Sequence, residues 1–68
     1  MSFKYKIGDK VSVNGVDGVI FSVGYAKKDS RDFTICDASR AVLEELRGYQ
    51  VNLGRHIRIV KESDIIAR

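Results

Sequence analysis

The chain has 68 residues, of which 44% are hydrophobic and 31% are charged, a composition typical of one soluble globular domain. A chain of this length buries only about 60% of the surface that it exposes when unfolded, which favours a groove or flat face over a deep substrate cleft. Twelve Lys and Arg against nine Asp and Glu give a net charge of +3. This mild basic excess permits contact with nucleic acid and disfavours a DNA-mimicking inhibitor, which needs an acidic surface.

The cysteine count and the hydropathy indicate a compartment. Cys36 is the only cysteine, so no disulfide can form within the chain and a reducing environment is expected. No apolar run approaches the roughly 18 residues of a membrane span, and the first five residues lack the apolar centre of a signal peptide. We therefore expect a cytoplasmic protein without membrane contact.

The first half of the sequence predicts two strands joined by one compact turn. Val11 and Val13 alternate with polar residues, which is typical of a half-buried strand. Asn-Gly at 14–15 and Asp-Gly at 17–18 favour positive φ and lie too close together for two hairpins.

Residues 19–25 predict the second strand, with Phe21 and Val23 on one face and Ile20 on the other. A short strand is expected over 33–36. We expect Phe21 and Phe33 in the core.

The middle of the chain predicts the one helix. Residues 26–32 are expected to form a charged loop, and residues 38–47 predict a short amphipathic helix with Val42, Leu43 and Leu46 on one stripe. A helix of about two and a half turns is marginal alone, so it is expected to dock on the sheet.

The last third predicts a second hairpin and a closing segment. Strands are expected at 49–53 and 56–60, with the hairpin tip at 53–55. A turn over 61–64 leads into a short apolar segment at 65–66. There is no repeat or linker, and residues 1–68 are interpreted as one domain.

This layout resembles the Src-homology-3-like (SH3-like) small β-barrels, particularly their KOW and Tudor-like relatives. The resemblance lies in four short patterns: apolar-Gly-Asp-x-Val at 7–11, Gly-Val-Ile at 18–20, Tyr-x-Val at 49–51, and Val-x-x-Ser-Asp-Ile at 60–65. It implies a mainly β fold, a five-stranded barrel with one short α-helix inserted. The helix departs from the family, which usually has a short loop there. Such scaffolds bind nucleic acids or peptides or act as accessory subunits, and the fold alone does not choose among these.

No catalytic, metal or cofactor site is predicted. Nothing in the sequence pairs His56 with Cys36 or supplies the third group that orients a catalytic base. One Cys and one His cannot provide the four ligands of a structural zinc site. The glycines at 8, 15 and 18 do not match a phosphate-binding loop. We therefore expect a non-enzymatic protein without a small-molecule substrate.

Basic residues in the charged loop and the second hairpin are the candidate nucleic-acid-binding residues. They can follow a phosphate backbone, while Tyr5, Tyr25 or Tyr49 could stack on bases. The alternative is that these are solvated faces with the aromatic side chains buried. The candidates are Lys27, Lys28, Arg31, Arg55, His56 and Arg58.

Two functions follow as hypotheses. The first is a small-barrel module that binds DNA or RNA through its basic loop and hairpin. The second is a protein-interaction module, similar to the small accessory or inhibitor proteins of bacteriophages, which docks on a larger host protein. One continuous basic face would favour nucleic acid, whereas an exposed apolar patch or unpaired strand edge would favour a protein partner.

Overall fold

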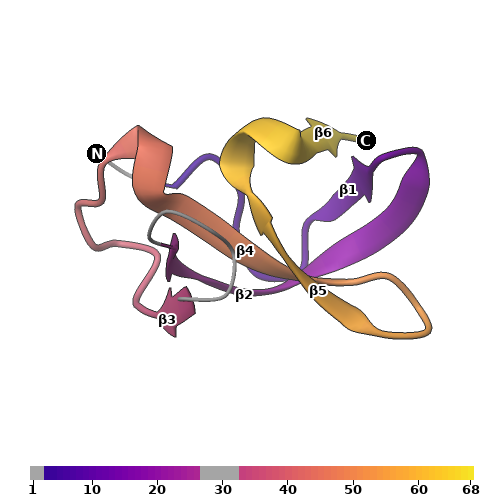
Figure 1. Cartoon of the computed structure of the whole chain (residues 1–68), viewed down its shortest axis with the longest axis horizontal. Helices are drawn as coiled ribbons and strands as arrows, with labels where there is room; N and C mark the ends of the chain where they lie inside the picture. The colour runs from indigo at the N-terminus through magenta and orange to yellow at the C-terminus, as the bar shows by residue number, and fades with distance from the viewer. Residues whose placement is uncertain (1–2, 27–32) are drawn as a thin grey trace.

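The computed structural model describes residues 3–26 and 33–68 and shows a mainly β fold (Figure 1). Its elements in chain order are β1 (Lys10–Val13), β2 (Val16–Ala26), β3 (Phe33–Ile35), the 3-10 turn η1 (Glu44–Leu46), β4 (Arg47–Asn52), β5 (Ile57–Lys61), the 3-10 turn η2 (Glu62–Asp64) and β6 (Ile65–Ala67). The predicted strands of both hairpins and the turn before the closing strand are therefore confirmed, and the short strand predicted over 33–36 forms at 33–35.

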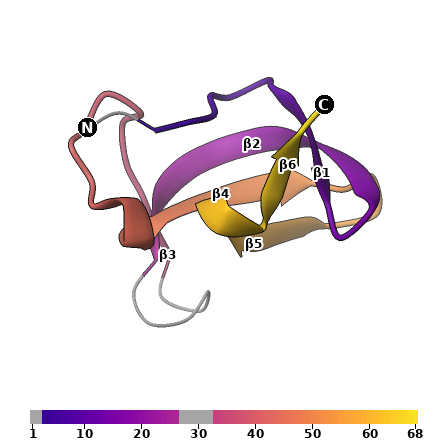
Figure 2. The ribbon, with the colours of Figure 1, turned by 90° about the horizontal axis from the view of Figure 1, so that it is seen from above.

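The six strands form one antiparallel sheet in the order β5-β4-β2-β1-β6, and β3 pairs with the far end of β2. The long β2 organises the sheet, because it pairs with β4 on one side and with first β1 and then β3 on the other. Figure 2 shows the curved β2 alongside β4, with β1 and β6 at the end where the β1–β2 turn lies.

The sheet has one strand more than expected and is not a closed barrel. Among the described strands, β5 and β6 stand at the two ends of the strand order and do not pair with each other. The turn η2 separates them and redirects the chain, so that β6 pairs with β1. The prediction of a closed five-stranded barrel is wrong on both points.

The core lies on the inner face of the bent sheet. Val11 and Val13 are buried there, as their alternation predicted. The turn between β1 and β2 is formed by Asn14 and Gly15, with φ values of 51° and 81°, the two-residue geometry that matches the twist of paired strands. Gly18, which the sequence predicts in this turn, instead lies in β2. The core cluster is Tyr5, Val11, Val13, Ile20, Val23, Tyr49, Val51, Val60 and Ile65.

A bulge in β2 moves Phe21 out of the core. The pairing of β2 with β4 shifts between Ile20 and Ser22, and a bulge of this kind breaks the two-residue alternation. Ile20 and Val23 are consequently both buried, whereas Phe21 is 53% exposed. Phe33 also lies outside the core cluster; it is half-buried with its ring against Gly48. The core prediction for both phenylalanines is wrong.

The helix predicted over 38–47 does not form; the described segment contains only the turn η1. At the end of this segment, Arg47 pairs with Tyr25 of β2. Strand pairing requires an extended backbone, which excludes a helix there. The apolar stripe also divides: Val42 is buried, Leu43 is exposed and Leu46 is half-buried. Helical propensity over so short a segment is too weak to resist this pairing.

Candidate functional site

The two hairpin turns meet the last residue of the sequence at one end of the molecule, on the right of Figure 1. A groove of about 510 Å³ lies between them, which we call the hairpin groove. Residues from the β1–β2 hairpin, the β4–β5 hairpin and the end of the sequence line it. They are Lys10, Asp17, Gly18, Val19, Asn52, Leu53, Gly54 and Arg68.

Local hydrogen bonds fix the β4–β5 tip beside this groove. The Asn52 side-chain oxygen accepts a hydrogen bond from the Gly54 amide at 2.9 Å, and the Leu53 amide donates to the His56 carbonyl at 3.0 Å. Gly54 has a φ of +96°, a conformation that glycine adopts without steric cost. The tip is therefore a closed turn that carries Arg55 and His56 as exposed side chains.

The strand register places a row of side chains on the outer face of the sheet. Lys10 lies opposite Val19, Val19 opposite Asn52, and Asn52 opposite Ile57. Directly opposite residues of antiparallel strands share a face, so this row crosses four strands. It begins at the Lys10 side chain in the hairpin groove and ends at Ile57 on β5.

Exposed apolar side chains lie on this outer face, and one of them, Val19, lines the groove. Val19 is 41% exposed, Ile57 is 45% exposed and Phe21 is 53% exposed. In the neighbouring row, the Ser22 hydroxyl donates to the Gln50 side-chain oxygen, which ties β2 to β4 beside the bulge. The outer face therefore combines an aromatic and two aliphatic side chains with the cations of the groove.

The charge at this end is positive. Asp17 is the one carboxylate that lines the hairpin groove, and it forms an ion pair with Arg68. Because the charges of Asp17 and Arg68 balance, Lys10 contributes one net positive charge to the lining. Arg55 adds a second positive charge at the tip. Arg58 lies opposite the core residue Val51 and therefore projects from the other face of the sheet, where it is exposed.

The structure thus brings together part of the predicted site. Arg55, His56 and Arg58 are all exposed on the β4–β5 hairpin, although Arg58 lies on the opposite face from Ile57. Lys27, Lys28 and Arg31 lie outside the described residues. Of the tyrosines proposed to stack on bases, Tyr5 and Tyr49 are buried and Tyr25 is half-buried.

From the sequence, Lys10 is expected only to share a sheet edge with Lys4 and Lys6 and is not among the six candidates, and Arg68 and Phe21 are not predicted as binding residues. The Asn-Gly turn contained a signal for Lys10, since a two-residue turn at 14–15 fixes the register and sets this residue opposite Val19. Arg68 could be placed only by knowing that β6 pairs with β1. No local signal marks the bulge that exposes Phe21.

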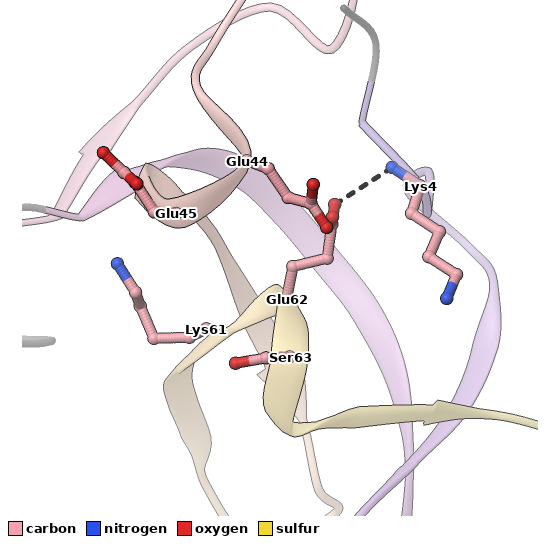
Figure 3. Close-up of a pocket in the computed structure, with 6 residues that line it drawn as sticks. All are labelled: Lys4, Glu44, Glu45, Lys61, Glu62 and Ser63. Atoms are coloured by element: carbon pink, nitrogen blue, oxygen red, sulfur yellow. Dashed lines mark hydrogen bonds between the residues drawn. The ribbon is translucent and has the colours of Figure 1, made fainter.

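A second hollow, of about 490 Å³, lies between the turns η1 and η2 and the segment that carries Lys4 (Figure 3). Its wall is built around Glu62, which is only 8% exposed. The Glu62 carboxylate accepts hydrogen bonds from Arg47 Nη1 at 3.1 Å, from the Lys4 amide at 3.1 Å and from the Tyr49 hydroxyl. The residues that line the hollow are Lys4, Glu44, Glu45, Lys61, Glu62 and Ser63.

This second hollow is structural. Burial raises the pKa of Glu62, but the hydrogen bonds from Tyr49, Lys4 and Arg47 outweigh it and hold that pKa below its ordinary value. Burial and the hydrogen bond to Glu62 raise the pKa of Tyr49. Glu62 is therefore an ionised carboxylate whose hydrogen bonds hold Lys4, Arg47 and Tyr49 together. Lys61 also makes a structural contact, because its Nζ donates to the Ala26 carbonyl at 3.2 Å.

Within residues 3–26 and 33–68, no three His, Cys, Asp or Glu side chains gather where they could hold a metal ion. Cys36 follows β3 at the end of the molecule opposite the tip that carries His56. The absence of an enzymatic activity stays a prediction.

No family model matches the chain, and no curated protein or solved structure is significantly similar to it. In the part of the chain that the structure describes, no helix combines the length and the apolar character needed to cross a membrane.

Proposed function

We propose that the protein is a non-enzymatic nucleic-acid-binding module of the cytoplasm, built on an SH3-like scaffold. The observation that carries this proposal is the hairpin groove, which is lined by Lys10 and by Arg68 ion-paired to the one lining carboxylate, Asp17. Arg55 is exposed on the adjoining hairpin tip, and the exposed Phe21 follows the lining residue Val19 by two positions in β2.

The groove supplies both kinds of contact that nucleic acids use. Lys10 and Arg55 are exposed, and neither forms an ion pair with another of the described residues, so both can neutralise phosphates. Asn52 offers a side-chain amide in the lining, and Val19 and Leu53 provide an apolar floor. Phosphate contacts give affinity that depends little on sequence. The module should therefore bind many sequences with modest affinity.

Salt-dependent binding tests this function. Fluorescence anisotropy of labelled DNA and RNA is measured against protein concentration at several salt concentrations, up to about 100 μM protein, the range of weak non-specific affinity. We expect the double substitution Lys10→Ala with Arg55→Ala to weaken binding to every sequence. For each phosphate that the variant no longer neutralises, the salt slope should become shallower by roughly 0.7 on single strands and 0.9 on duplexes.

A matched control removes the same charge from the other end. Lys4 and Arg40 are exposed and lie away from the hairpin groove, so Lys4→Ala with Arg40→Ala lowers the net charge equally. It should leave affinity and slope close to those of the unmodified protein. Equal weakening in the two variants would assign binding to net charge alone, and no binding by the unmodified protein would exclude the proposal.

One observation favours a protein partner as the second candidate. β5 pairs only with β4 among the described strands, and its outer face carries the exposed Ile57. An edge strand with an apolar face can accept an extended segment from another chain, and Arg55 and Arg58 would favour an acidic one. An accessory or inhibitor role of the bacteriophage type would use such a contact. Nuclease-treated pull-downs with the unmodified protein and Ile57→Asp test it, since only the former should retain the partner.

A further inference from the structure

We infer that the ligand of the hairpin groove is single-stranded nucleic acid, one base of which stacks on Phe21. This inference rests on the proposed function and specifies its substrate. Three observations carry it: the exposure of the Phe21 ring, the rigid backbone that presents it, and its position relative to the cations.

Phe21 differs from the other aromatic residues in its exposure. In the described part of the chain, Tyr5 and Tyr49 are buried, and Phe3, Tyr25 and Phe33 are half-buried. Phe21 alone is exposed. A β-branched or polar residue would be the usual choice on the solvent side of a strand, because an exposed aromatic ring loses the gain of burial.

The backbone under the ring is fixed on both sides. Ile20 is almost fully buried in the core and donates its amide to the Asp9 carbonyl at 2.9 Å. Ser22 is buried and is hydrogen-bonded to Gln50 across the sheet. The bulge between them therefore holds Phe21 outward, in the manner of bulges that re-aim a side chain at a binding site. A ring presented in this way loses little conformational freedom when it binds.

The ring lies within reach of a backbone held by the cations. Val19 lines the groove and lies opposite Lys10, and Phe21 follows Val19 by two residues of the same strand, roughly 6–7 Å. A phosphate on Lys10 would thus place a neighbouring base over the outer face at Phe21. Combined cations and stacking platforms are the features that bind single strands without sequence preference.

A duplex does not fit this geometry equally well, because base faces are hidden by stacking inside a double helix. Only an unpaired base can offer its π-face to Phe21, and every base has one. The structure therefore favours single-stranded over double-stranded ligands. Deoxyribose and ribose strands share this chemistry.

The absence of tryptophan from the sequence allows a direct spectroscopic test. Phe21→Trp introduces a single tryptophan at the proposed stacking position, and oligothymidine and oligouridine should both quench its fluorescence. Leu43→Trp is the matched control, because Leu43 is 60% exposed but lies at the other end of the molecule, just before η1 (Figure 1). Its fluorescence should not change. Equal quenching at the two positions, or none at either while anisotropy reports binding, would overturn the inference.

Affinity provides the second readout. Phe21→Leu should leave the thermal midpoint unchanged and weaken binding to single strands by about fivefold or more, the usual effect of removing one stacked base. Its binding to duplexes should not change. If the unmodified protein binds duplexes as tightly as single strands and Phe21→Leu alters neither, the inference is wrong and the proposed function stands. If it binds neither, both are wrong. Comparison of oligothymidine with oligouridine separates DNA from RNA as the preferred strand.

Discussion

Glu62 is the single residue on which distant parts of the chain converge. It lies in η2, and its carboxylate is bound by Arg47 and Tyr49 of β4 and by the amide of Lys4 from the start of the described chain. A buried carboxylate of this kind is stable only when its partners stay in place. Glu62 therefore links the segment before β1 to the middle and the end of the sheet.

Replacing this carboxylate should destabilise the fold and weaken its response to acid. Glu62→Gln keeps the side-chain size but leaves the buried Arg47 without its counter-ion, a cost of about 3–5 kcal/mol in comparable buried pairs. The pKa of Glu62 is lower in the folded state, so its contribution is fully present above the ordinary glutamate pKa of about 4.3 and is lost as the pH falls through the folded value. Thermal melts between about pH 6 and 3 measure both effects.

Asp37 provides the control for that measurement. Its pKa is also lowered, by hydrogen bonds from the Ser39 amide and then the Ser39 hydroxyl, but the residue is exposed. Asp37→Asn should keep most of the acid sensitivity, whereas Glu62→Gln should lose a clear part of it. A Glu62→Gln variant as acid-sensitive as the unmodified protein would show that Glu62 is not the main acid-labile group.

Gly18 tests the packing of the two hairpins against each other. A methyl group on Gly18 would lie 2.7 Å from a Val51 methyl carbon and 2.9 Å from the Asn52 carbonyl oxygen. We expect Gly18→Ala to lower the free energy of unfolding by about 1–3 kcal/mol, as overpacking does elsewhere. Val16→Ala, on an exposed side chain of the same strand, should have little effect in urea melts. Similar midpoints for the two variants would contradict this close approach.

At the scale of elements, the segment before β4 distinguishes a turn from a helix. Val42 is buried, and its carbonyl accepts a hydrogen bond from Arg47 Nε at 3.2 Å, whereas Leu43 is exposed. Val42→Ala should therefore cost about 1.5–3 kcal/mol, and Leu43→Ala no more than about 0.5 kcal/mol. A helix with both residues on its docked face would make the two costs similar. Urea-induced unfolding of the two variants decides between these arrangements.

Elements governed by local rules could be predicted from the sequence, and elements governed by distant contacts could not. The Asn14-Gly15 turn and the burial of Val11 follow from turn chemistry and alternation alone. The absence of the helix depends on Arg47, which is fixed by Glu62 and by the strand pairing with Tyr25. Phe21 is exposed by a shift of register against β4. The same difference applies to the candidate site. Arg55 and His56 could be predicted because they lie on one local hairpin, whereas Lys10 and Arg68 reach the groove only through strand pairing.

At the scale of the whole molecule, the fold is held together by contacts between its first and last parts. β6 pairs with β1, with Val13 opposite Ile65. The Tyr5 hydroxyl donates to the Ile65 carbonyl at 3.2 Å, and the Tyr5 amide donates to the Tyr49 hydroxyl at 3.2 Å. These pairings also bring Arg68 to the hairpin groove. The closing strand therefore contributes to both stability and the proposed binding site.

Neighbouring isoleucines in β6 separate these two contributions. Ile65 is buried in the core and Ile66 is exposed. Ile65→Ala should cost about 2–5 kcal/mol, a large part of the roughly 3–10 kcal/mol expected for a domain of this size. It should therefore lose chemical-shift dispersion in amide NMR spectra on mild heating, and binding should fall in parallel. Ile66→Ala should retain both the fold and the affinity. An Ile65→Ala variant that stays folded at the unmodified midpoint would show that β6 does not close the core, and the position of Arg68 beside Asp17 would then need another support.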